Sequence, residues 1–357
     1  MNLWRCLGLS MLLMGAMCLL GASEVSTFVG AQEKDKKDEK KDPPKKEDPK
    51  KEVVPQPPAK GALEFKAFDF AAYPKDKAVF YQEQYTSTKQ TMKVLGQEVV
   101  QDQKQTFLIE WTVKEKEAGI FVVVQKIVHV DMTIDIGGNK ITYKSNQANQ
   151  PKNPMTDFFE QLRKSSLTFY VNADLTVKEI KNRDEFIKGL GAINPQMQGL
   201  LNAILSDAAL KKMAEPTWYA FPAKGEIPAS KTWDKTSELD LGPIGKYKTK
   251  FDFTHKKSEG GKDTIGIVTK LDYTAPSDKA GLPFVIHSAK LSTKNGKGEA
   301  IFDRAKGRFD STEISMELDG TLEIEVGNMK TIVELKQEQT AKSTTFDEIP
   351  GKWATAK

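Results

Sequence analysis

The stretch from Asp184 to Met213 reads DEFIKGLGAINPQMQGLLNAILSDAALKKM, and the fold of the rest of the chain depends on it. Apolar side chains recur within it at i, i+3, i+4, i+7, i+8 and i+11, the spacing of one continuous stripe on an α-helix. These positions are Met197, Leu200, Leu201, Ile204, Leu205 and Ala208. Such a stripe must be buried, and strand-like sequence lies on both sides of it. Asn194-Pro195 interrupts the pattern, so we expect two or three short helices rather than one rod.

The sequence before this stretch predicts long antiparallel strands. Val79 to Val94 and Glu98 to Lys114 are separated by a turn at Leu95-Gly96-Gln97, and apolar and polar residues then alternate from Val128 to Ile136. Alternation with period two predicts a sheet with one buried face and one solvent-exposed face. Gly137-Gly138-Asn139 predicts a tight hairpin into the next strand. Strands longer than about ten residues are unusual and favour a strongly curved sheet or an open barrel.

A short helix and a hairpin are expected between this β region and the helical stretch. Met155 to Leu162 has the composition of a short helix, and Thr156 is a suitable capping residue for it. Asn172-Ala173-Asp174 then predicts the turn of a hairpin. Both features lead directly into the helical stretch.

The sequence after the helical stretch predicts a second series of strands, from Trp233 to Thr340. Short turns are expected at Glu259-Gly260-Gly261, Asn295-Gly296, Lys306-Gly307, Asp319-Gly320 and Gly327-Asn328. Consecutive short turns make an antiparallel meander the simplest topology. The fold class is therefore α+β, mostly β: a large curved antiparallel meander sheet or open barrel, with the helical insertion packed on its concave face. The sequence leaves open whether the two β regions form one sheet or two.

The N-terminal residues indicate export. Leu7 to Leu20 (LGLSMLLMGAMCLL) is an apolar segment of about 14 residues, too short for an ordinary transmembrane helix. Arg5 precedes it, and Val29-Gly30-Ala31 offers small residues for signal-peptidase cleavage. We therefore expect residues 1–31 to be a signal peptide and the mature chain to be secreted or periplasmic, with no transmembrane segment. An uncleaved anchor and a lipoprotein attached at Cys18 are the competing interpretations.

Composition divides the remainder into a tail and a single domain. Residues 32–60 consist largely of Lys, Asp, Glu and Pro and cannot bury enough apolar surface to fold, so we expect them to be disordered. Residues 61–357 are expected to form one β-rich domain, with its helical insertion at about 184–213. Cys6 and Cys18 both lie in the leader, so the mature domain must be held together by its hydrophobic core without disulfides.

The sequence contains no pattern that predicts catalysis. It has no signature of a serine hydrolase, a zinc protease, an EF-hand or a P-loop. His129 and Asp131 share one face of a predicted strand, which would suit a metal or an acid–base pair, but we interpret them as an exposed surface pair. We predict no catalytic residue, no metal and no cofactor, and hence no enzyme. A carbohydrate-active enzyme remains the distant alternative, because a glycosidase needs only two carboxylates.

The net charge of +4 arises from intermixed lysines and acids, so we expect no nucleic-acid partner. Turn and core residues carry a resemblance to known proteins: Trp233 at the start of a strand, Leu241-Gly242-Pro243-Ile244-Gly245, Gly298 to Asp303 (GEAIFD), and Gly307-Arg308. In these residues the chain resembles an uncharacterised family of secreted bacterial β-rich proteins, a domain of unknown function, over Phe65 to Ile349. That resemblance implies no activity and no site. The expected architecture is also similar to periplasmic lipoprotein-carrier-like folds, in which a curved antiparallel sheet wraps helices and shelters acyl chains.

We therefore predict a secreted, non-catalytic protein of the bacterial cell envelope that binds an apolar ligand or lipid between sheet and helices. The residues expected to line that site are Met197, Leu200, Leu201, Ile204, Trp218, Tyr219 and Phe221. A structural or protein-interaction domain without a ligand is the alternative, with an envelope protein as its partner. A carrier should contain a continuous apolar cavity, whereas a structural domain should have a filled core there.

Overall fold

A computed structural model describes residues 79–117, 120–150, 152–172, 176–195, 198–214, 227–277, 282 and 284–353. The predicted signal peptide and tail lie outside the described residues, as do Met197, Trp218, Tyr219 and Phe221.

The described chain consists of twelve strands, four α-helices and two short 3₁₀ helices. The strands are β1 (Val79–Val94), β2 (Gln97–Glu117), β3 (Ile120–Ile136), β4 (Asn139–Lys144), β5 (Ser166–Val171), β6 (Val177–Lys181), β7 (Thr232–Asp240), β8 (Lys246–Glu259), β9 (Lys262–Thr274), β10 (Val285–Asp303), β11 (Arg308–Val326) and β12 (Met329–Phe346). The helices are α2 (Pro154–Lys164), α3 (Arg183–Gly191), α4 (Gln198–Ile204), α5 (Asp207–Ala214), η4 (Gly242–Ile244) and η5 (Gly351–Trp353).

All twelve strands form one antiparallel sheet. Its order is β6-β5-β3-β2-β1-β12-β11-β10-β9-β8-β7, and β4 is paired with β3 off this path. The first and last strands pair with each other from Tyr81 opposite Phe346 to Val94 opposite Val333. This pairing joins the two β regions of the sequence into a single curved sheet, so the question that the sequence left open is answered. The sheet does not close: its path ends at β6 on one side and at β7 on the other.

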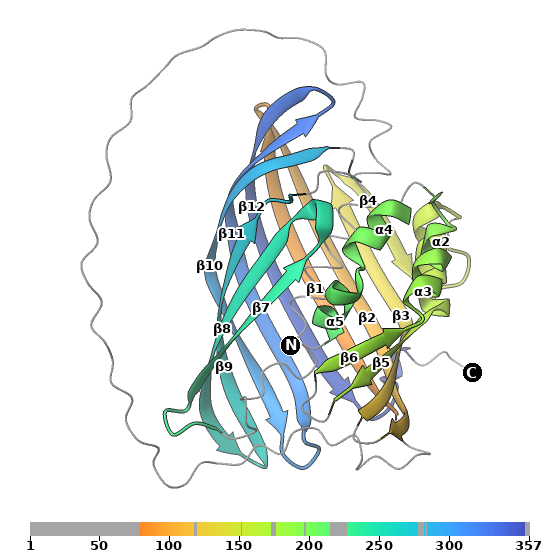
Figure 1. Ribbon diagram of the computed structural model, residues 1–357, viewed down its shortest axis with the longest axis vertical. Coiled ribbons are helices and arrows are strands. Elements are labelled where there is room, and N and C mark those ends of the chain that lie inside the picture. Colours follow the sequence, from red (N-terminus) through yellow and green to blue (C-terminus); the bar gives the residue numbers. More distant parts are fainter. Residues whose placement is uncertain are drawn as a thin grey trace, which may run out of the picture.

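The helical insertion lies between these two ends in sequence and in space. Helix α5 packs against both β6 and β7, α2 packs on β3, and α4 packs on η4. Figure 1 shows α2 to α5 gathered along the side of the curved sheet where β4 to β7 lie. The predicted fold class is thus confirmed, and the Asn194-Pro195 break does separate α3 from α4.

The capping residue of α2 differs from the expectation. Asn153, not Thr156, occupies the N-cap position, and its side-chain oxygen accepts a hydrogen bond from the backbone N–H of Thr156 at 2.9 Å. Pro154 can then take the first helical position, where its missing N–H costs nothing. The hydroxyl of Tyr143 on β4 donates to Glu160 of α2 at 2.5 Å, which fixes the helix to the sheet. Burial first, and then this hydrogen bond, raise the pKa of Tyr143 to about 12.

Two of the predicted turns are absent. Asn295-Gly296 and Asp319-Gly320 lie inside the continuous strands β10 and β11 rather than between strands. At Asn295-Gly296 the register between β10 and β11 shifts by one residue, because these two residues lie opposite one residue of β11 and form a bulge. At Gly320 an added Cβ would collide with the backbone of Lys290, so glycine serves close strand packing there instead of a turn.

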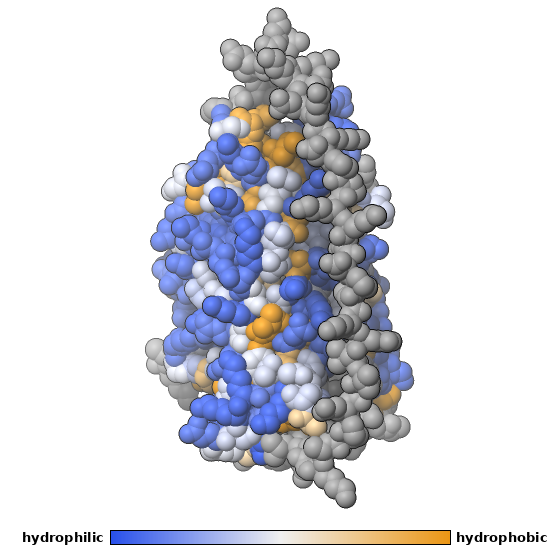
Figure 2. Space-filling view, turned by 90° about the vertical axis from the view of Figure 1, so that its left-hand side faces the viewer, coloured by the Kyte–Doolittle hydropathy of each residue, from blue (hydrophilic) through white to orange (hydrophobic). Residues whose placement is uncertain are grey.

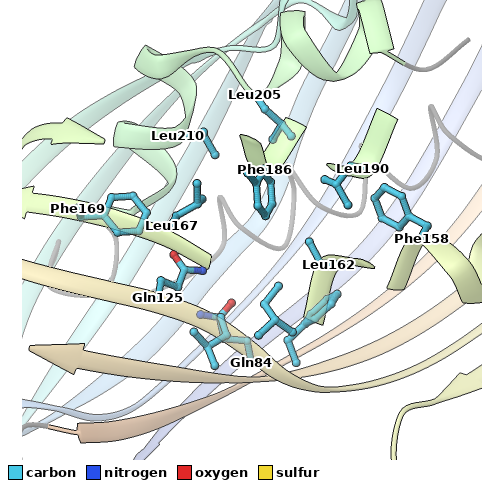
Figure 3. A pocket seen from close by; sticks show the side chains of 13 residues that line it. Gln84, Gln125, Phe158, Leu162, Leu167, Phe169, Phe186, Leu190, Leu205 and Leu210 are labelled. Carbon is cyan, nitrogen blue, oxygen red and sulfur yellow. The ribbon is translucent and has the colours of Figure 1, made fainter. Parts of the chain in front are cut away.

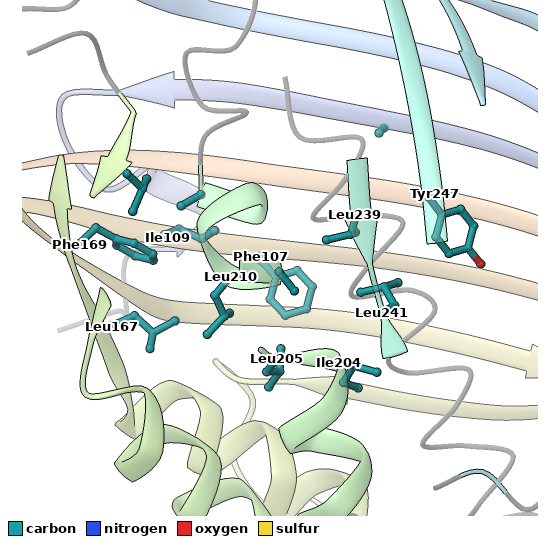
Figure 4. Close-up of a cluster of buried hydrophobic side chains, with 14 of the residues drawn as sticks. Phe107, Ile109, Leu167, Phe169, Ile204, Leu205, Leu210, Leu239, Leu241 and Tyr247 are labelled. Atoms are coloured by element: carbon teal, nitrogen blue, oxygen red, sulfur yellow. The ribbon is translucent and has the colours of Figure 1, made fainter. Parts of the chain in front are cut away.

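The concave face carries the core. Leu205 and Leu210, from the end of α4 and from α5, lie near Phe107 of β2 and Leu239 of β7, so the helices fill the space between the two sheet edges (Figure 4). Nearby, Trp111 stacks on Phe80 with ring centroids 6.1 Å apart.

A band of uncharged polar residues crosses the middle of the concave face, on β1, β2 and β12. We call it the amide belt; its members are Gln82, Gln84, Thr86, Thr88, Gln90, Gln101, Gln103, Gln105, Gln337 and Gln339, all of them buried. Gln84 donates to Gln82 at 2.9 Å, and similar bonds link successive glutamines on the other two strands. The hydroxyls of Thr86 and Thr88 have no hydrogen-bond partner among the described residues, so within them the belt is only partly satisfied.

Candidate ligand-binding cavity

The sheet divides where β9 and β10 separate. These strands pair from Asp303 opposite Lys262 to Lys297 opposite Val268, and no register pair follows. Beyond that point β9 is paired with β8, and β10 is paired with β11. We call this separation the fork. The hydroxyl of Thr293 on β10 accepts from the N–H of Leu271 at 2.9 Å and donates to its carbonyl at 3.1 Å, so it satisfies backbone groups that lose their strand partner.

The bulge at Asn295-Gly296 explains the fork. Asn295 has a φ of 52°, in the left-handed region, which turns β10 away from the ladder with β9. Gly296 lies so close to the backbone of Thr269 that an added Cβ would collide with its carbonyl oxygen. A larger residue at this position would separate β9 from β10 nearer to their paired end. Gly296 therefore determines the position along the two strands at which the sheet opens.

An apolar cavity of about 460 Å³ occupies the fork. We call it the fork cavity. Its lining residues are Gln90, Met92, Val94, Ile244, Tyr247, Tyr273, Leu282, Phe284, Ile286, Leu291, Leu318, Leu322, Ile324, Val326, Val333, Leu335 and Gln337. All except two of these residues are aliphatic, aromatic or Met. The volume falls within the range of about 300–1,000 Å³ that is typical of small-molecule sites.

Two tyrosines form the wall of the fork cavity beneath η4. The rings of Tyr247 and Tyr273 meet edge to face with centroids 5.0 Å apart. The Tyr273 hydroxyl donates to the carbonyl of Ile244 at 2.6 Å, so its polar end is occupied and its ring faces the cavity. Burial raises the pKa of both tyrosines, which keeps this wall uncharged.

The amide belt forms the polar edge of the fork cavity. Gln90 and Gln337 belong to both, and they lie opposite each other in the pairing of β1 with β12. Gln337 donates to Gln339 at 3.3 Å. The side-chain oxygen of Gln90 has no hydrogen-bond partner in the described part of the chain, although the residue is buried. An unpaired acceptor at the edge of an apolar cavity favours a ligand that brings a donor to it.

A second and much smaller cavity lies under the helices. It measures about 90 Å³, and Figure 3 shows side chains of α2, α3 and α5 surrounding it together with Gln84 and Gln125 from the sheet. We call it the helix cavity. Phe158, Leu162, Phe186 and Leu190 line it, and its small volume indicates that this region is close to a filled core.

The helical residues proposed from sequence as ligand contacts are placed in the core. Leu200, Leu201 and Ile204 are all buried, and neither cavity is lined by them. Their role as ligand contacts stays a prediction, as does that of Met197, Trp218, Tyr219 and Phe221, which lie outside the described residues. The lining of the fork cavity comes instead from the second β region and from the end of β1.

Sequence reasoning missed this lining although its alternation was visible. Leu318, Leu322 and Ile324 face the same side of one strand, as period two requires. Alternation shows that a face is apolar but does not show whether another element covers it. The signal that could have located the cavity was Asn295-Gly296, had it been interpreted as a bulge rather than a turn.

Titratable residues also cluster at the opposite end of β8 and β9. The buried Asp263 accepts two hydrogen bonds from Arg304, both at 2.6 Å, and one from Ser258 at 2.5 Å. Nε2 of His255 lies 3.0 Å from Asp263 and 3.1 Å from Ser258. Both partners therefore contact the same imidazole nitrogen, whereas a hydrolytic triad needs serine and carboxylate on opposite nitrogens. The network ties strands together and lacks the geometry of a nucleophile relay.

His129 and Asp131, which we interpreted from the sequence as an exposed surface pair, contact different neighbours in the structure. His129 stacks on Trp353 of η5, with ring centroids 5.3 Å apart, while Asp131 forms an ion pair with Lys144 at 3.5 Å. Burial first, and then the charge of Arg163, lower the pKa of His129. Among the described residues, no three His, Cys, Asp or Glu side chains are grouped so that they could hold a metal ion.

The comparison with known families gives one match. Residues 118–326, more than half of the chain, match the profile of a "Family of unknown function (DUF6263)". The resemblance to an uncharacterised domain family, expected from turn and core residues, is thereby confirmed. No curated protein sequence matches the chain.

Solved structures give only distant likenesses. Lipovitellin, whose structure concerns lipid–protein interactions, is 10% identical with a TM-score of 0.40; the match covers 78% of this chain but only 26% of lipovitellin. Pseudomonas aeruginosa OccK5 (OpdH) is 5% identical with a TM-score of 0.22 and coverages of 76% and 98%. The outer membrane protein OprG of Pseudomonas aeruginosa is 9% identical with a TM-score of 0.19 and coverages of 75% and 96%. These scores are too low to indicate a shared function or ligand. None of the helices in the described part of the chain has the length and apolarity needed to span a bilayer.

Proposed function

The chain belongs to DUF6263, a family of unknown function, and we therefore propose a function from the geometry of the cavity: the protein binds an apolar ligand of the lipid class in the fork cavity. The proposal takes up the sequence-based expectation of a non-catalytic, secreted envelope protein and changes where the ligand sits. The ligand occupies the fork of β9 and β10 rather than the space under α4.

The observation that carries the proposal is the combination of volume and lining. An apolar cavity of about 150 Å³ already stays dry and binds a small aromatic molecule, and the fork cavity has about three times that volume. Empty space of this size forfeits the dispersion contacts of every side chain that borders it, including Leu291, Leu322 and Phe284. An acyl chain or a comparable apolar body restores these contacts, so binding stabilises the fold.

The polar edge of the cavity adds a preference for the end of the ligand. The side-chain oxygen of Gln90 is free to accept a hydrogen bond from a ligand. The other polar lining residue, Gln337, also carries a neutral amide. Among the residues that the structure describes, no charged side chain lines the cavity. A neutral donor, such as a hydroxyl or an amide N–H, therefore suits this edge better than a carboxylate or a phosphate, whose charge would be buried without a counter-charge.

Identification of copurified ligand is the direct test. The mature chain, purified without detergent, is extracted with organic solvent, and the extract is analysed by mass spectrometry. We expect neutral lipid in a stoichiometric amount. A folded protein that brings no lipid and binds no apolar probe would overturn the proposal and favour the structural domain.

A binding assay with matched variants locates the site. The neutral fluorophore N-phenyl-1-naphthylamine serves as the probe, and Leu322→Trp fills the fork cavity. Val268→Trp places the same side chain at a 51% exposed position on β9. We expect L322W to abolish probe binding and V268W to leave it unchanged. Equal binding by wild type and L322W would place the site elsewhere.

A further inference from the structure

Half of the large apolar side chains that are exposed in the described chain lie on two neighbouring hairpin tips. Leu95 is 73% exposed, Ile332 64%, Met329 51% and Val326 47%; four others are exposed elsewhere. We call these four residues the tip patch. Figure 2 shows hydrophobic side chains gathered at the upper end of the molecule, the end at which Figure 1 places the β11–β12 hairpin.

Strand register places the four residues at the same end of the sheet, with Val326 and Met329 on the face that lines the fork cavity and Ile332 on the opposite face. The pairing of β1 with β12 ends at Val94 opposite Val333, so Leu95 and Ile332 are the next residues on each strand. They border the same shallow hollow on the surface. Val326 and Met329 form the last pair of the β11–β12 hairpin, which therefore projects beyond the β1–β2 turn.

Leucine is an unfavourable residue for the turn position that Leu95 occupies. Its φ is 51°, a left-handed conformation that is sterically disfavoured for a bulky side chain and suits Asn or Gly. The comparable turns at Gly137-Gly138 and Gly260-Gly261 do use glycine at both central positions. A large apolar residue that is both strained and exposed suggests selection for a contact outside the folded domain.

The tip patch is continuous with the fork cavity. Val326 lines the cavity and is also exposed at the tip, and Met329 lies directly opposite Val326. An apolar path therefore leads from the hairpin tips into the cavity. A molecule that enters along this path need not cross a charged surface.

We propose that the tip patch inserts into the surface of a lipid bilayer and so places the mouth of the fork cavity against the membrane. This inference rests on the proposed function, because the bilayer is the source or the destination of the ligand. Hairpin tips present separate apolar points, which suit penetration between lipid headgroups better than the flat area of a stable protein interface. Lys93 and Lys330 flank the tips, and their long stems can keep the ammonium groups at headgroup level.

The charges around the tips indicate which kind of membrane is needed. Glu323 and Glu334 border the same hollow as the two lysines, and Lys330 lies 3.9 Å from Glu323. With the signs balanced, attraction to anionic lipid is small, so insertion depends on apolar contact. Binding should therefore occur on neutral vesicles and change little with salt.

Flotation of the mature chain with phosphatidylcholine vesicles tests the inference. Leu95→Asn suits the left-handed turn, so it should preserve or raise the thermal midpoint while it weakens vesicle binding. We expect a loss of roughly tenfold for L95N, and a larger loss when Met329→Gln is added, since each removes one inserted apolar side chain. Val268→Asn is the control, because it replaces an apolar side chain that is 51% exposed and remote from the tips in strand register. This variant should bind vesicles as the wild type does.

The same variants separate this inference from the proposed function. In vesicle-free solution, L95N should bind N-phenyl-1-naphthylamine as well as the wild type, and L322W should still bind vesicles. Probe binding without vesicle binding by the wild type would overturn the membrane inference and leave the cavity proposal standing. Undiminished vesicle binding by L95N/M329Q would overturn it as well. A wild-type dimer in light scattering that L95N/M329Q dissociates would instead identify the patch as a contact between two copies.

Discussion

The two ends of the concave face use similar residues and differ in how well they are filled. Under α2 to α5 the aliphatic side chains interdigitate with those of the sheet and leave about 90 Å³. In the fork, the sheet presents an equally apolar surface to about 460 Å³ of space. The helices α3 to α5 cover one end because they connect β6 to β7 along the chain, and α2 connects β4 to β5 beside them. Among the described elements, η4 borders the other end.

This difference shows that the helical insertion and the larger cavity occupy separate parts of the concave face. A carrier and a structural domain were expected to differ in whether the helices fill the concave face. The helices do fill their own end, and the sheet opens at a distance from them, where β10 bulges away from β9. A filled core and an apolar cavity therefore coexist on one face.

A matched pair of leucine truncations should show this difference most strongly. Leu201→Ala in α4 removes a fully buried side chain, and we expect a loss of about 2–5 kcal/mol in the free energy of unfolding. Leu322→Ala in β11 should cost only about 1 kcal/mol, because its side chain already borders empty space. Urea unfolding of both variants, purified without lipid, measures the two losses. Equal losses would mean that the fork is as tightly packed as the helical end.

The buried carboxylate of Asp263 and its partner Arg304 should stabilise the paired part of β9 and β10. Asp263→Asn removes the negative charge and replaces one of the two oxygens that accept from Arg304 with an NH2 donor, so we expect a loss of about 2–3 kcal/mol in the free energy of unfolding. Burial alone would raise the pKa of Asp263, but its hydrogen bonds from Arg304, Ser258 and His255 outweigh burial and hold the pKa below its ordinary value.

The sign of the pH dependence follows from that lowered pKa. The carboxylate contributes stability above the unfolded-state pKa of about 3.9, and the contribution is lost as the pH falls through the lower folded-state value. The free energy of unfolding, measured between about pH 3 and about pH 6, should decrease in the wild type as the pH falls. In D263N the decrease should be smaller. A wild-type curve that is flat over this range would contradict the assignment.

The fold class could be predicted from the sequence because the spacing of apolar residues shows which side of a strand or helix is buried. The alternation at Leu318 and Leu322 and the helical stripe at Leu200, Leu201 and Ile204 each predict an element and its buried side. The Asn194-Pro195 break was correctly predicted because proline limits the backbone locally. Each of these features depends on residues that are close together in the chain.

The cavity could not be predicted because it depends on contacts between distant residues. The pairing of β1 with β12 brings Gln90 next to Gln337, and no local pattern specifies that partner. Asn295-Gly296 has the composition of a turn, yet the ladder with β11 continues past it and converts it into a bulge. Whether an apolar face is covered depends on the path of the whole chain. The candidate contacts chosen on α4 are buried, and their role as ligand contacts stays a prediction.

The smallest expected effect concerns the polar edge that separates the two ends. Gln90→Leu removes a buried acceptor without a partner, so the free energy of unfolding should rise by about 1 kcal/mol in the ligand-free protein. If the oxygen of Gln90 holds the donor of a ligand, the same change should weaken binding of 1-decanol relative to decane in competition with N-phenyl-1-naphthylamine. Gln103→Leu is the matched control, since Gln103 is a buried belt residue that does not line the fork cavity and already donates to Gln105. Q103L should lose stability and leave the decanol preference intact. If Q90L keeps the preference for decanol, Gln90 is only structural and another group holds the hydroxyl. If neither the wild type nor Q90L prefers decanol, the cavity selects ligands by apolar volume alone.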